Sequence, residues 1–306
     1  MKMNYYVFIY PEMILLMSGI SFTLSENINL APYCSMKAGG NAKYFVEPKT
    51  EAELLYALKY FKAIGERYIV VGKCSNLLFP DSGFDGAVIS ACSMKGMSVE
   101  NGIVTAMCGE TLSSLATTAC ENSITGFEFC YGIPGSVGGG VYMNAGAYGG
   151  ELSNIFVSGR FINESLEIVT LTKEEMDFGY RKSRMAFEGL ILISASFKGE
   201  EGNKDEIRSL MDELMAKRKR TQPLEYPSCG SAFKRPVGNF AGALIEQCGL
   251  KGTSVGGAEV SEKHAGFIIN KNNATATDVI NLLNLVSDTV FEKTGVRLEP
   301  EIRIIE

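Results

Sequence analysis

The sequence predicts an α+β protein made of a larger N-terminal part and a smaller C-terminal part. A capping-box signal, Thr50-Glu-Ala-Glu53, opens a helical pattern that runs to about Lys62, and a short apolar strand follows at Tyr68–Val71. Asn101-Gly102 stands between β-rich flanks and favours a two-residue hairpin. The polar segment 198–204 contains two glycines and precedes another helical pattern, so we expect a hinge there.

The remaining elements follow from local patterns on either side of this segment. Before it, residues 111–121 predict a helix, and three apolar runs predict a mostly antiparallel sheet: 155–162, 166–170 and 190–197. After it, the sequence predicts helices and one strand: 205–220, 240–248, 266–269 (the strand) and 277–293. In the last helix, apolar residues recur on one face: Val279, Ile280, Leu283, Val286 and Val290.

Composition excludes several classes of protein. With 306 residues, 46% hydrophobic and 21% charged, the chain is neither disordered nor fibrous. The net charge of −6 argues against broad nucleic-acid binding, and no feature indicates a protein partner. The eight cysteines include no C-x-x-C pair, so we expect reduced thiols in a cytoplasmic protein, with no metal site and no disulfide scaffold.

The N-terminus predicts an extension of uncertain status over residues 1–24. Tyr5–Ile20 is apolar, but Pro11 and Glu12 interrupt it, and it is shorter than the roughly 20 residues that a membrane span needs. The region before it carries one positive charge, which argues against a signal peptide. Met13 and Met17 are alternative starts, and we expect no membrane span.

The segment Gly132–Gly150, which we call the glycine run, is the most informative part of the sequence. Packing alone gives little reason for so many glycines, because each loses more conformational freedom on folding than any other residue. We therefore expect its backbone to approach a ligand such as a flavin or a nucleotide pyrophosphate, with Ser136 and Asn144 reaching phosphate or ribose. The alternative is a glycine-rich turn between strands.

A second loop, Gly72–Leu78, has the same character and is called the upstream loop. It follows the strand at Tyr68–Val71 and reads Gly-Lys-Cys-Ser-Asn-Leu-Leu. Two such loops are suited to hold one diphosphate between them. Neither has the order G-x-G-x-x-G or the GKS/GKT of a nucleoside triphosphatase, which argues against those two folds.

Several short strings, in order over roughly residues 30–306, resemble the UDP-N-acetylenolpyruvoylglucosamine reductase (MurB) family. They are Ala38–Asn41 with Tyr44–Pro48, the upstream loop, Glu128–Gly150, Gly179-Tyr-Arg-Lys-Ser183, Cys229–Pro236, His264–Asn270 and Leu298-Glu-Pro-Glu301. The resemblance is to the compact subtype that lacks an additional tyrosine-bearing loop. The chain departs from the family pattern at Cys74, where a glycine is common, and at Ser35-Met36-Lys37.

This resemblance implies a fold and a cofactor. The fold is a two-part FAD-binding domain of the vanillyl-alcohol-oxidase (PCMH) type over residues 25–198, followed by an α+β substrate-binding domain over 199–306. Because the single histidine, His264, is far in sequence from both glycine-bearing loops, we expect non-covalent FAD. The implied FAD contacts are Val71, Gly72, Lys73, Cys74, Ser75, Asn76, Leu77, Gly132, Ile133, Pro134, Gly135, Ser136, Gly138, Gly139, Asn144, Ala145 and Gly146.

The resemblance also implies the reaction. NADPH reduces the flavin, and the reduced flavin passes a hydride to the enolpyruvyl ether of a UDP-sugar in peptidoglycan precursor synthesis. Hydride addition creates an enolate-like charge, which calls for a cation and a proton donor. Two alternatives remain open: an FAD-dependent alcohol or hydroxy-acid oxidase or dehydrogenase of the same superfamily, and a non-catalytic nucleotide-sugar-binding protein.

Three residues match the family's catalytic positions. Arg181 is the active-site arginine, suited to a carboxylate because its guanidinium stays charged and binds in a bidentate manner. By the same resemblance, Ser231 matches the serine that donates the proton, and Glu301 matches the family's catalytic carboxylate. Glu299 is the competing candidate, since alternation along a strand places it on the same face as Glu301.

Four further residues are expected to contact substrate. Lys234 and Arg235 follow the serine closely and are candidates for the diphosphate or uridine side, with a solvated basic pair as the alternative. His264 falls at a polar contact position of the family, although a histidine before an apolar strand is as often a core residue. Tyr148, near the end of the glycine run, is a candidate for ring contact with ligand.

Overall fold

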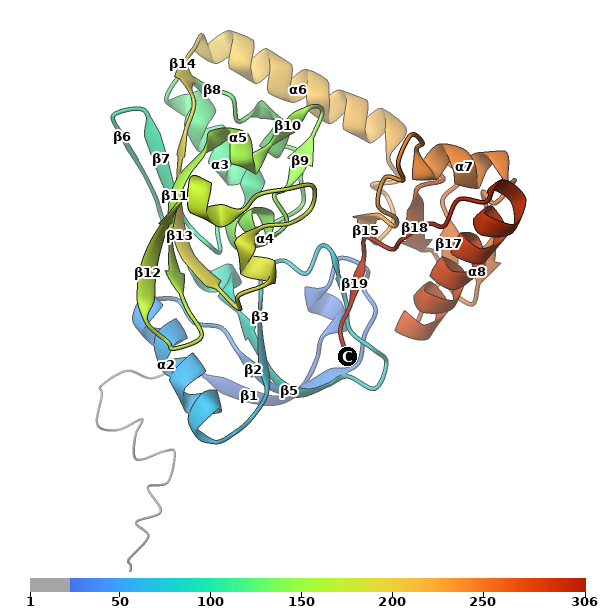
Figure 1. The fold of residues 1–306 in the computed structure, drawn as a ribbon, viewed down its shortest axis with the longest axis horizontal. Coiled ribbons are helices and arrows are strands. Elements are labelled where there is room, and N and C mark those ends of the chain that lie inside the picture. The colour runs from blue at the N-terminus through green and yellow to red at the C-terminus, as the bar shows by residue number, and fades with distance from the viewer. Residues whose placement is uncertain (1–22) are drawn as a thin grey trace, which may run out of the picture.

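The computed structural model describes residues 23–306, which form two bodies connected by the long helix α6 (Lys204–Thr221) (Figure 1). The prediction for the apolar segment Tyr5–Ile20 lies outside the described residues, as does that for residues 1–22 of the extension. The last residue of the predicted extension, Leu24, begins a strand. Within residues 23–306, no helix combines the length and the apolar character that a bilayer span requires.

The first sheet has the order β1-β2-β5-β3, and its last three strands are parallel. The strands are β1 (Leu24–Asn29), β2 (Asn41–Val46), β5 (Phe84–Ser90) and β3 (Tyr68–Val71). Helix α2 (Glu51–Ala63) begins as predicted, because the Thr50 side chain accepts a hydrogen bond from the Glu53 N–H at 3.2 Å. The carboxylate of Glu53 accepts from the N–H of Lys49 rather than completing the box.

The second sheet is antiparallel throughout, in the order β12-β11-β13-β7-β6. At its edge Asn101 and Gly102 both have positive φ (50° and 76°), as the predicted hairpin requires. One core cluster joins both sheets and their helices, so these two sheets form a single body. The elements are β6 (Met97–Glu100), β7 (Ile103–Met107), α3 (Leu112–Glu121), α4 (Val137–Tyr142), β9 (Gly146–Ala147), β10 (Gly150–Glu151), α5 (Leu152–Ile155), β11 (Phe156–Ile162), β12 (Ile168–Thr172) and β13 (Ile191–Lys198).

The C-terminal body is a third sheet, also antiparallel, in the order β15-β18-β17-β16. The apolar face predicted for its long helix is buried, apart from Ile280, which is half-buried. Its elements are β15 (Ser228–Ser231), α7 (Ala241–Gln247), β16 (Ser254–Val255), β17 (Ala258–Val260), β18 (Phe267–Asn270) and α8 (Ala276–Thr294).

The segment expected to be a hinge is paired rather than free. Within it β14 (Glu200–Glu201) pairs with β8 (Ile124–Thr125), and the next two buried residues of α6, Ile207 and Met211, belong to the core of the first body. The change from one body to the other therefore takes place along α6, which spans the top of the view in Figure 1. The domain boundary between residues 198 and 199 stays a prediction.

The chain returns to the first body at its C-terminal end. Strand β19 (Arg303–Ile304), labelled near the C-terminus in Figure 1, runs parallel to β4 (Leu77–Leu78), and the Arg303 N–H donates to the Asn76 carbonyl at 3.0 Å. A second link comes from Asp81, whose carboxylate accepts from the backbone N–H groups of Ala276 and Thr277 at the start of α8. These contacts hold the C-terminal body against the upstream loop.

Candidate functional site

The upstream loop and the glycine run lie directly against each other. A Cβ atom built on Gly72 would be 2.0 Å from the Ser136 Oγ, and one on Gly135 would be 3.8 Å from the Ser75 Oγ. Two loops separated by more than 50 residues thus share one edge, and Gly72 is required there because no side chain fits. This is the arrangement expected of a pair of loops that hold one diphosphate.

The upstream loop presents backbone donors. Within residues 23–306, no protein acceptor takes a hydrogen bond from the N–H groups of Lys73, Cys74 or Ser75. Cys74 has a φ of +46°, so the backbone changes hand inside the loop, as it does in anion-binding nests. The predicted contacts of this loop therefore have the geometry that an anionic ligand needs.

For part of the glycine run, the expectation that packing gives little reason for glycine was wrong. A Cβ atom would lie 3.2 Å from the side chain of Cys108 at Gly138, 2.9 Å from Leu152 at Gly140, and 2.5 Å from the ring of Phe129 at Gly150. The run also contains helix α4, whose first N–H groups are taken by the protein: those of Val137 and Gly138 donate to the carbonyls of Glu110 and Cys108. The close approach predicted for these glycines is to the protein itself.

Other glycines of the run keep an open side. Gly139 is exposed, and a Cβ atom there would meet only the Ser136 Oγ at 3.4 Å. Ser136 is itself buried and caps α4 by accepting from the Gly139 N–H at 3.3 Å. The open edge is therefore the part that also contacts the upstream loop.

Asn144 positions the turn that carries the predicted arginine. It is buried, its side-chain N–H donates to the Gly179 carbonyl at 3.1 Å, and its side-chain oxygen accepts from the Ser153 N–H at 2.9 Å. Ser183, at the other end of the turn, donates to the Tyr142 carbonyl at 2.9 Å. Both ends of Asn144 are used within the protein, so it anchors the Gly179–Ser183 turn to the glycine run.

Arg181 is at the tip of this turn and has a φ of +55°, which is uncommon for a residue with a side chain. Its Nε–H donates to Glu301 Oε1 at 2.8 Å, and an Nη–H donates to the Gly146 carbonyl at 3.4 Å. The structure therefore joins two of the three predicted catalytic residues, 120 positions apart in the sequence, beside the glycine run.

The structure distinguishes Glu301 from Glu299. The side chain of Glu301 is 12% exposed and pairs with Arg181, whereas that of Glu299 is 70% exposed and pairs with Lys234 at 2.8 Å. Burial raises the pKa of the Glu301 carboxyl, although Arg181 and Lys234 both act to lower it. The two carboxylates thus have different partners, contrary to the simple expectation of a shared face.

Backbone contacts bring Ser231 to the same region. The Glu301 N–H donates to the carbonyl of Ala232, the residue after Ser231, at 2.8 Å, and the Asn76 side chain donates to the Glu301 carbonyl at 2.9 Å. Ser231 is exposed at the end of β15. The upstream loop, the C-terminal strand and the serine strand therefore meet at Glu301.

The neighbouring thiol, Cys229, is buried, and burial raises its pKa to about 12. Its S–H donates to the Leu77 carbonyl at 3.6 Å. A protonated, enclosed thiol acts as a packing group rather than as a nucleophile.

The four predicted substrate contacts, Lys234, Arg235, Tyr148 and His264, have different surroundings. Lys234 and Arg235 lie near the site, since Lys234 acts on Glu301 and the Arg235 N–H donates to the Tyr180 hydroxyl at 3.4 Å. Tyr148 is exposed and faces α6, with the Lys217 ammonium 5.4 Å from its ring centre.

His264 has the environment of a partly enclosed structural residue. Its Nδ1 accepts from the Gly266 N–H at 3.1 Å, its ring lies 4.9 Å from that of Phe267, and burial lowers its pKa. Gly266 in turn accepts from the Ala232 N–H at 2.8 Å, which connects His264 to the serine strand through the backbone only.

Sequence reasoning missed two cations that border the site. Arg218 of α6 lies against the glycine run, with its Cδ 3.0 Å from where a Gly132 Cβ would be, and burial lowers its pKa. The Arg303 guanidinium lies 4.6 Å from the ring centre of Tyr142. The basic last turn of α6 was visible in the sequence, but nothing local indicated that it would face the glycine run.

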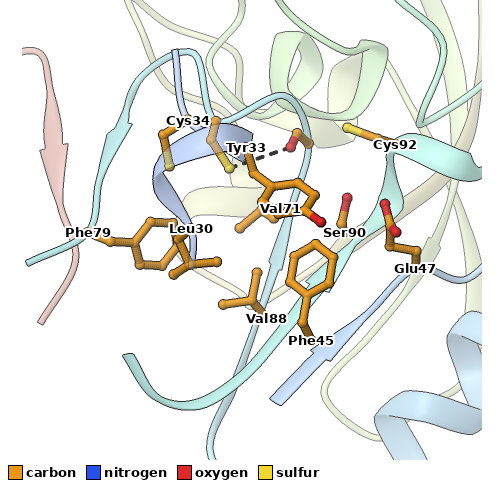
Figure 2. Close-up of a pocket in the computed structure, with 12 residues that line it drawn as sticks. Leu30, Tyr33, Cys34, Phe45, Glu47, Val71, Phe79, Val88, Ser90 and Cys92 are labelled. Atoms are coloured by element: carbon orange, nitrogen blue, oxygen red, sulfur yellow. Dashed lines mark hydrogen bonds between the residues drawn. The ribbon is translucent and has the colours of Figure 1, made fainter. Parts of the chain in front are cut away.

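A cavity of about 70 Å³ lies beneath the upstream loop (Figure 2). It is mainly apolar, and Figure 2 shows Leu30 and Phe79 on one side and Glu47 and Ser90 on the other. Its remaining lining residues are Tyr33, Cys34, Phe45, Val71, Gly72, Cys74, Val88 and Cys92.

Comparison with known proteins agrees with this geometry. Residues 42–172 match the FAD binding domain model, and residues 222–305 match the model of the UDP-N-acetylenolpyruvoylglucosamine reductase C-terminal domain. The chain is 45% identical to the UDP-N-acetylenolpyruvoylglucosamine reductase of Caldicellulosiruptor bescii, over 96% of this chain and 94% of that protein. For the Latilactobacillus sakei reductase the identity is also 45%, over 93% and 94%. The crystal structure of the Thermus caldophilus reductase (MurB) aligns with a TM-score of 0.79 and 33% identity, over 94% of this chain and 99% of that one.

Proposed function

This chain belongs to the UDP-N-acetylenolpyruvoylglucosamine reductase family, and we propose that Arg181, Ser231 and Glu301 carry out its reaction with NADPH as the hydride donor. The protein is an FAD-containing oxidoreductase that reduces UDP-N-acetylenolpyruvoylglucosamine in peptidoglycan synthesis. The observation that carries the residue assignment is the 2.8 Å contact between Arg181 Nε and Glu301 Oε1, formed where both glycine-bearing loops and the C-terminal strand meet.

The residues present fit FAD. The backbone donors of Lys73 and Ser75 and the close approach of Gly72 to Ser136 suit a pyrophosphate held along the shared edge of the two loops. When bound there, FAD supplies the hydride of the reaction. We expect non-covalent binding, because the single histidine, His264, lies in the C-terminal body.

Arg181 is the group best suited to the charge that develops on the substrate. Its Nε–H is engaged by Glu301, which fixes the plane of the guanidinium and leaves N–H groups at the other edge for a substrate carboxylate. The unusual φ of +55° at the tip of the turn is consistent with a backbone held for function. A donor fixed in advance stabilises transition-state charge more than a mobile one.

Ser231 supplies the proton in this proposal. Its exposed hydroxyl stands one residue before Ala232, whose carbonyl binds the Glu301 N–H. A free hydroxyl is a very weak acid, so this role requires Arg181 and Lys234, the two cations that act on Glu301, to stabilise the alkoxide that forms as Ser231 gives up its proton. In this proposal Glu301 orients Arg181 and takes part in returning a proton to the Ser231 hydroxyl.

Lys234 and Arg235 are assigned to the phosphates of the UDP group. Both are exposed, and both lie beside the turn that carries Arg181. In a chain with a net charge of −6, they provide a local positive region for a doubly charged diphosphate. The cytoplasm is the proposed location, which agrees with eight cysteines that are all free thiols.

The test is product identification. Protein purified with FAD is incubated with NADPH and UDP-N-acetylenolpyruvoylglucosamine, and we expect a product heavier by about two hydrogens, formed at the rate at which NADPH is consumed. Consumption of an alcohol or hydroxy acid with oxygen, and none of the enolpyruvyl sugar, would instead identify the oxidase alternative.

A further inference from the structure

Cys34 and Cys74 form a contact that the reductase reaction does not use. Both side chains are buried and line the cavity beneath the upstream loop, and the Cys74 S–H donates to the Gly72 carbonyl at 3.6 Å. The backbones also touch, since the Ser35 N–H donates to the Cys74 carbonyl at 3.3 Å. Figure 2 shows Cys34 on the side of the cavity that also holds Leu30 and Phe79.

The two thiols are chemically different. Interaction with the neighbouring Cys74 thiol lowers the pKa of Cys34, an effect that burial opposes and Lys37 supports. The same contact, together with burial, raises the pKa of Cys74. Cys34 is therefore the more readily ionised thiol, and a second thiol lies in contact with it. This is the arrangement of an attacking and a resolving cysteine.

Small oxidants fit the space available. The cavity of about 70 Å³ is lined by both cysteines and exceeds the roughly 10–15 Å³ that one water needs, so a hydrogen peroxide molecule can be accommodated beside Cys34. In reducing compartments, disulfides of this kind are transient and act in redox sensing.

We propose that Cys34 and Cys74 are a redox modification site, at which hydrogen peroxide forms a disulfide that crosslinks the turn around Cys34 to the upstream loop. The Cys34 thiolate attacks one peroxide oxygen, the O–O bond breaks, and a sulfenic acid and one water result. The Cys74 sulfur then attacks the sulfenic sulfur, an S–S bond forms, and a second water leaves. Two thiols lose two electrons and two protons, and peroxide gains them.

The crosslink reaches the cofactor site through the loop itself. A disulfide fixes the sulfur separation at about 2 Å, shorter than any non-bonded contact between two thiols, so we expect its formation to shift the loop backbone around Cys74. Cys74 lies between Lys73 and Ser75, whose N–H groups are the proposed anion donors. We therefore expect the oxidised protein to bind FAD about tenfold more weakly. This consequence rests on the proposed cofactor site, whereas formation of the disulfide does not.

The experiment maps the crosslink directly. Full-length protein, with FAD and after its removal, is treated with hydrogen peroxide, its free thiols are blocked, and disulfide-linked peptides are identified by mass spectrometry. We expect a Cys34–Cys74 linkage, a loss of about 2 Da, and reversal by dithiothreitol. FAD affinity is measured by absorbance on the same oxidised and reduced samples.

Variants separate this site from general oxidation. Cys34→Ser is expected to abolish the linkage, whereas Cys92→Ser, which alters another cysteine of the same cavity, retains it. If Cys34→Ser does not fold, Cys74→Gly serves instead, because glycine tolerates the φ of +46°. Oxidation only to sulfinic acids, or a crosslink to Cys92, would overturn the proposal. An intact linkage with unchanged FAD affinity would overturn the coupling to the cofactor site, and loss of FAD binding in the reduced protein would count against the cofactor site alone.

Discussion

Replacing the carboxylate of Glu301 with an amide separates catalysis from folding. Glu301→Gln keeps the shape of the side chain but removes its charge and its capacity to carry a proton. Because burial raises the Glu301 pKa despite the contact with Arg181, the cost of enclosing the charge exceeds the attraction between the two groups. The amide oxygen can still accept from Arg181, whose side chain is 25% exposed, so the free energy of unfolding should fall by about 1–2 kcal/mol, less than for a fully buried ion pair.

Turnover, in contrast, should fall steeply. Loss of a proton-transfer group or of a fixed charge in the active site lowers kcat by about 10²–10³-fold, equivalent to about 3–4 kcal/mol of transition-state stabilisation. The matched control is Glu299→Gln, two residues away. Its side chain is 70% exposed and pairs with Lys234, so we expect kcat to change by less than about threefold.

The assay follows both half-reactions. Flavin absorbance under anaerobic conditions should show normal reduction by NADPH in Glu301→Gln, and slow reoxidation by UDP-N-acetylenolpyruvoylglucosamine. Urea unfolding of the same preparations measures stability. Wild-type turnover in Glu301→Gln, or a larger loss in Glu299→Gln, would refute the assignment.

Three further predictions concern the donor, the loops and the histidine. Ser231→Ala should leave flavin reduction by NADPH intact and lower turnover of the enolpyruvyl substrate by about 10²–10⁴-fold; normal turnover would exclude the serine as proton donor. Gly72→Ala places a Cβ 2.0 Å from the Ser136 Oγ, so it should force the two loops apart and weaken FAD binding at least tenfold by absorbance titration, and unchanged affinity would show that the loops do not share the cofactor. Because burial lowers the pKa of His264 below 6.5, its contribution to the free energy of unfolding is present above about pH 6.5 and is lost as pH falls through the lowered pKa. Urea unfolding at about pH 7.5 and 5.5 should therefore show a smaller decrease for His264→Gln than for wild type, and equal decreases would contradict the burial of His264.

Elements with local signals were predictable from the sequence. The strand Tyr68–Val71 has the predicted bounds, and α3 and α8 begin after Thr111 and Thr275, whose side chains accept from the N–H three residues later. The hairpin at Asn101 was predictable because two successive positive φ angles favour asparagine and glycine. Each of these signals acts over only a few residues.

Contacts between distant residues could not be predicted in this way. The pairing of β19 with β4 joins segments more than 200 residues apart, and β14 pairs with β8 within a segment whose polar composition indicated a hinge. Nothing local in Glu200–Glu201 specifies a partner. Pairing of this kind is determined by the packing of the whole chain.

The candidate site also combines features that have a local sequence signal with features that depend on contacts between distant residues. The family motif indicated Arg181 and Glu301, but strand alternation did not separate Glu301 from Glu299, because their side chains have different partners rather than a shared one. The glycine run is unusual in its composition alone. Its composition did not reveal that Gly138, Gly140 and Gly150 are required by packing within the protein, since that depends on which side chains surround them.

The most direct test of the account is an anaerobic titration of the purified protein with NADPH, followed by UDP-N-acetylenolpyruvoylglucosamine. We expect the flavin absorbance to be lost on addition of NADPH and to return on addition of the enolpyruvyl sugar, with one sugar reduced per flavin reoxidised. A colourless protein that binds no FAD, or a reduced flavin that the sugar does not reoxidise, would contradict it.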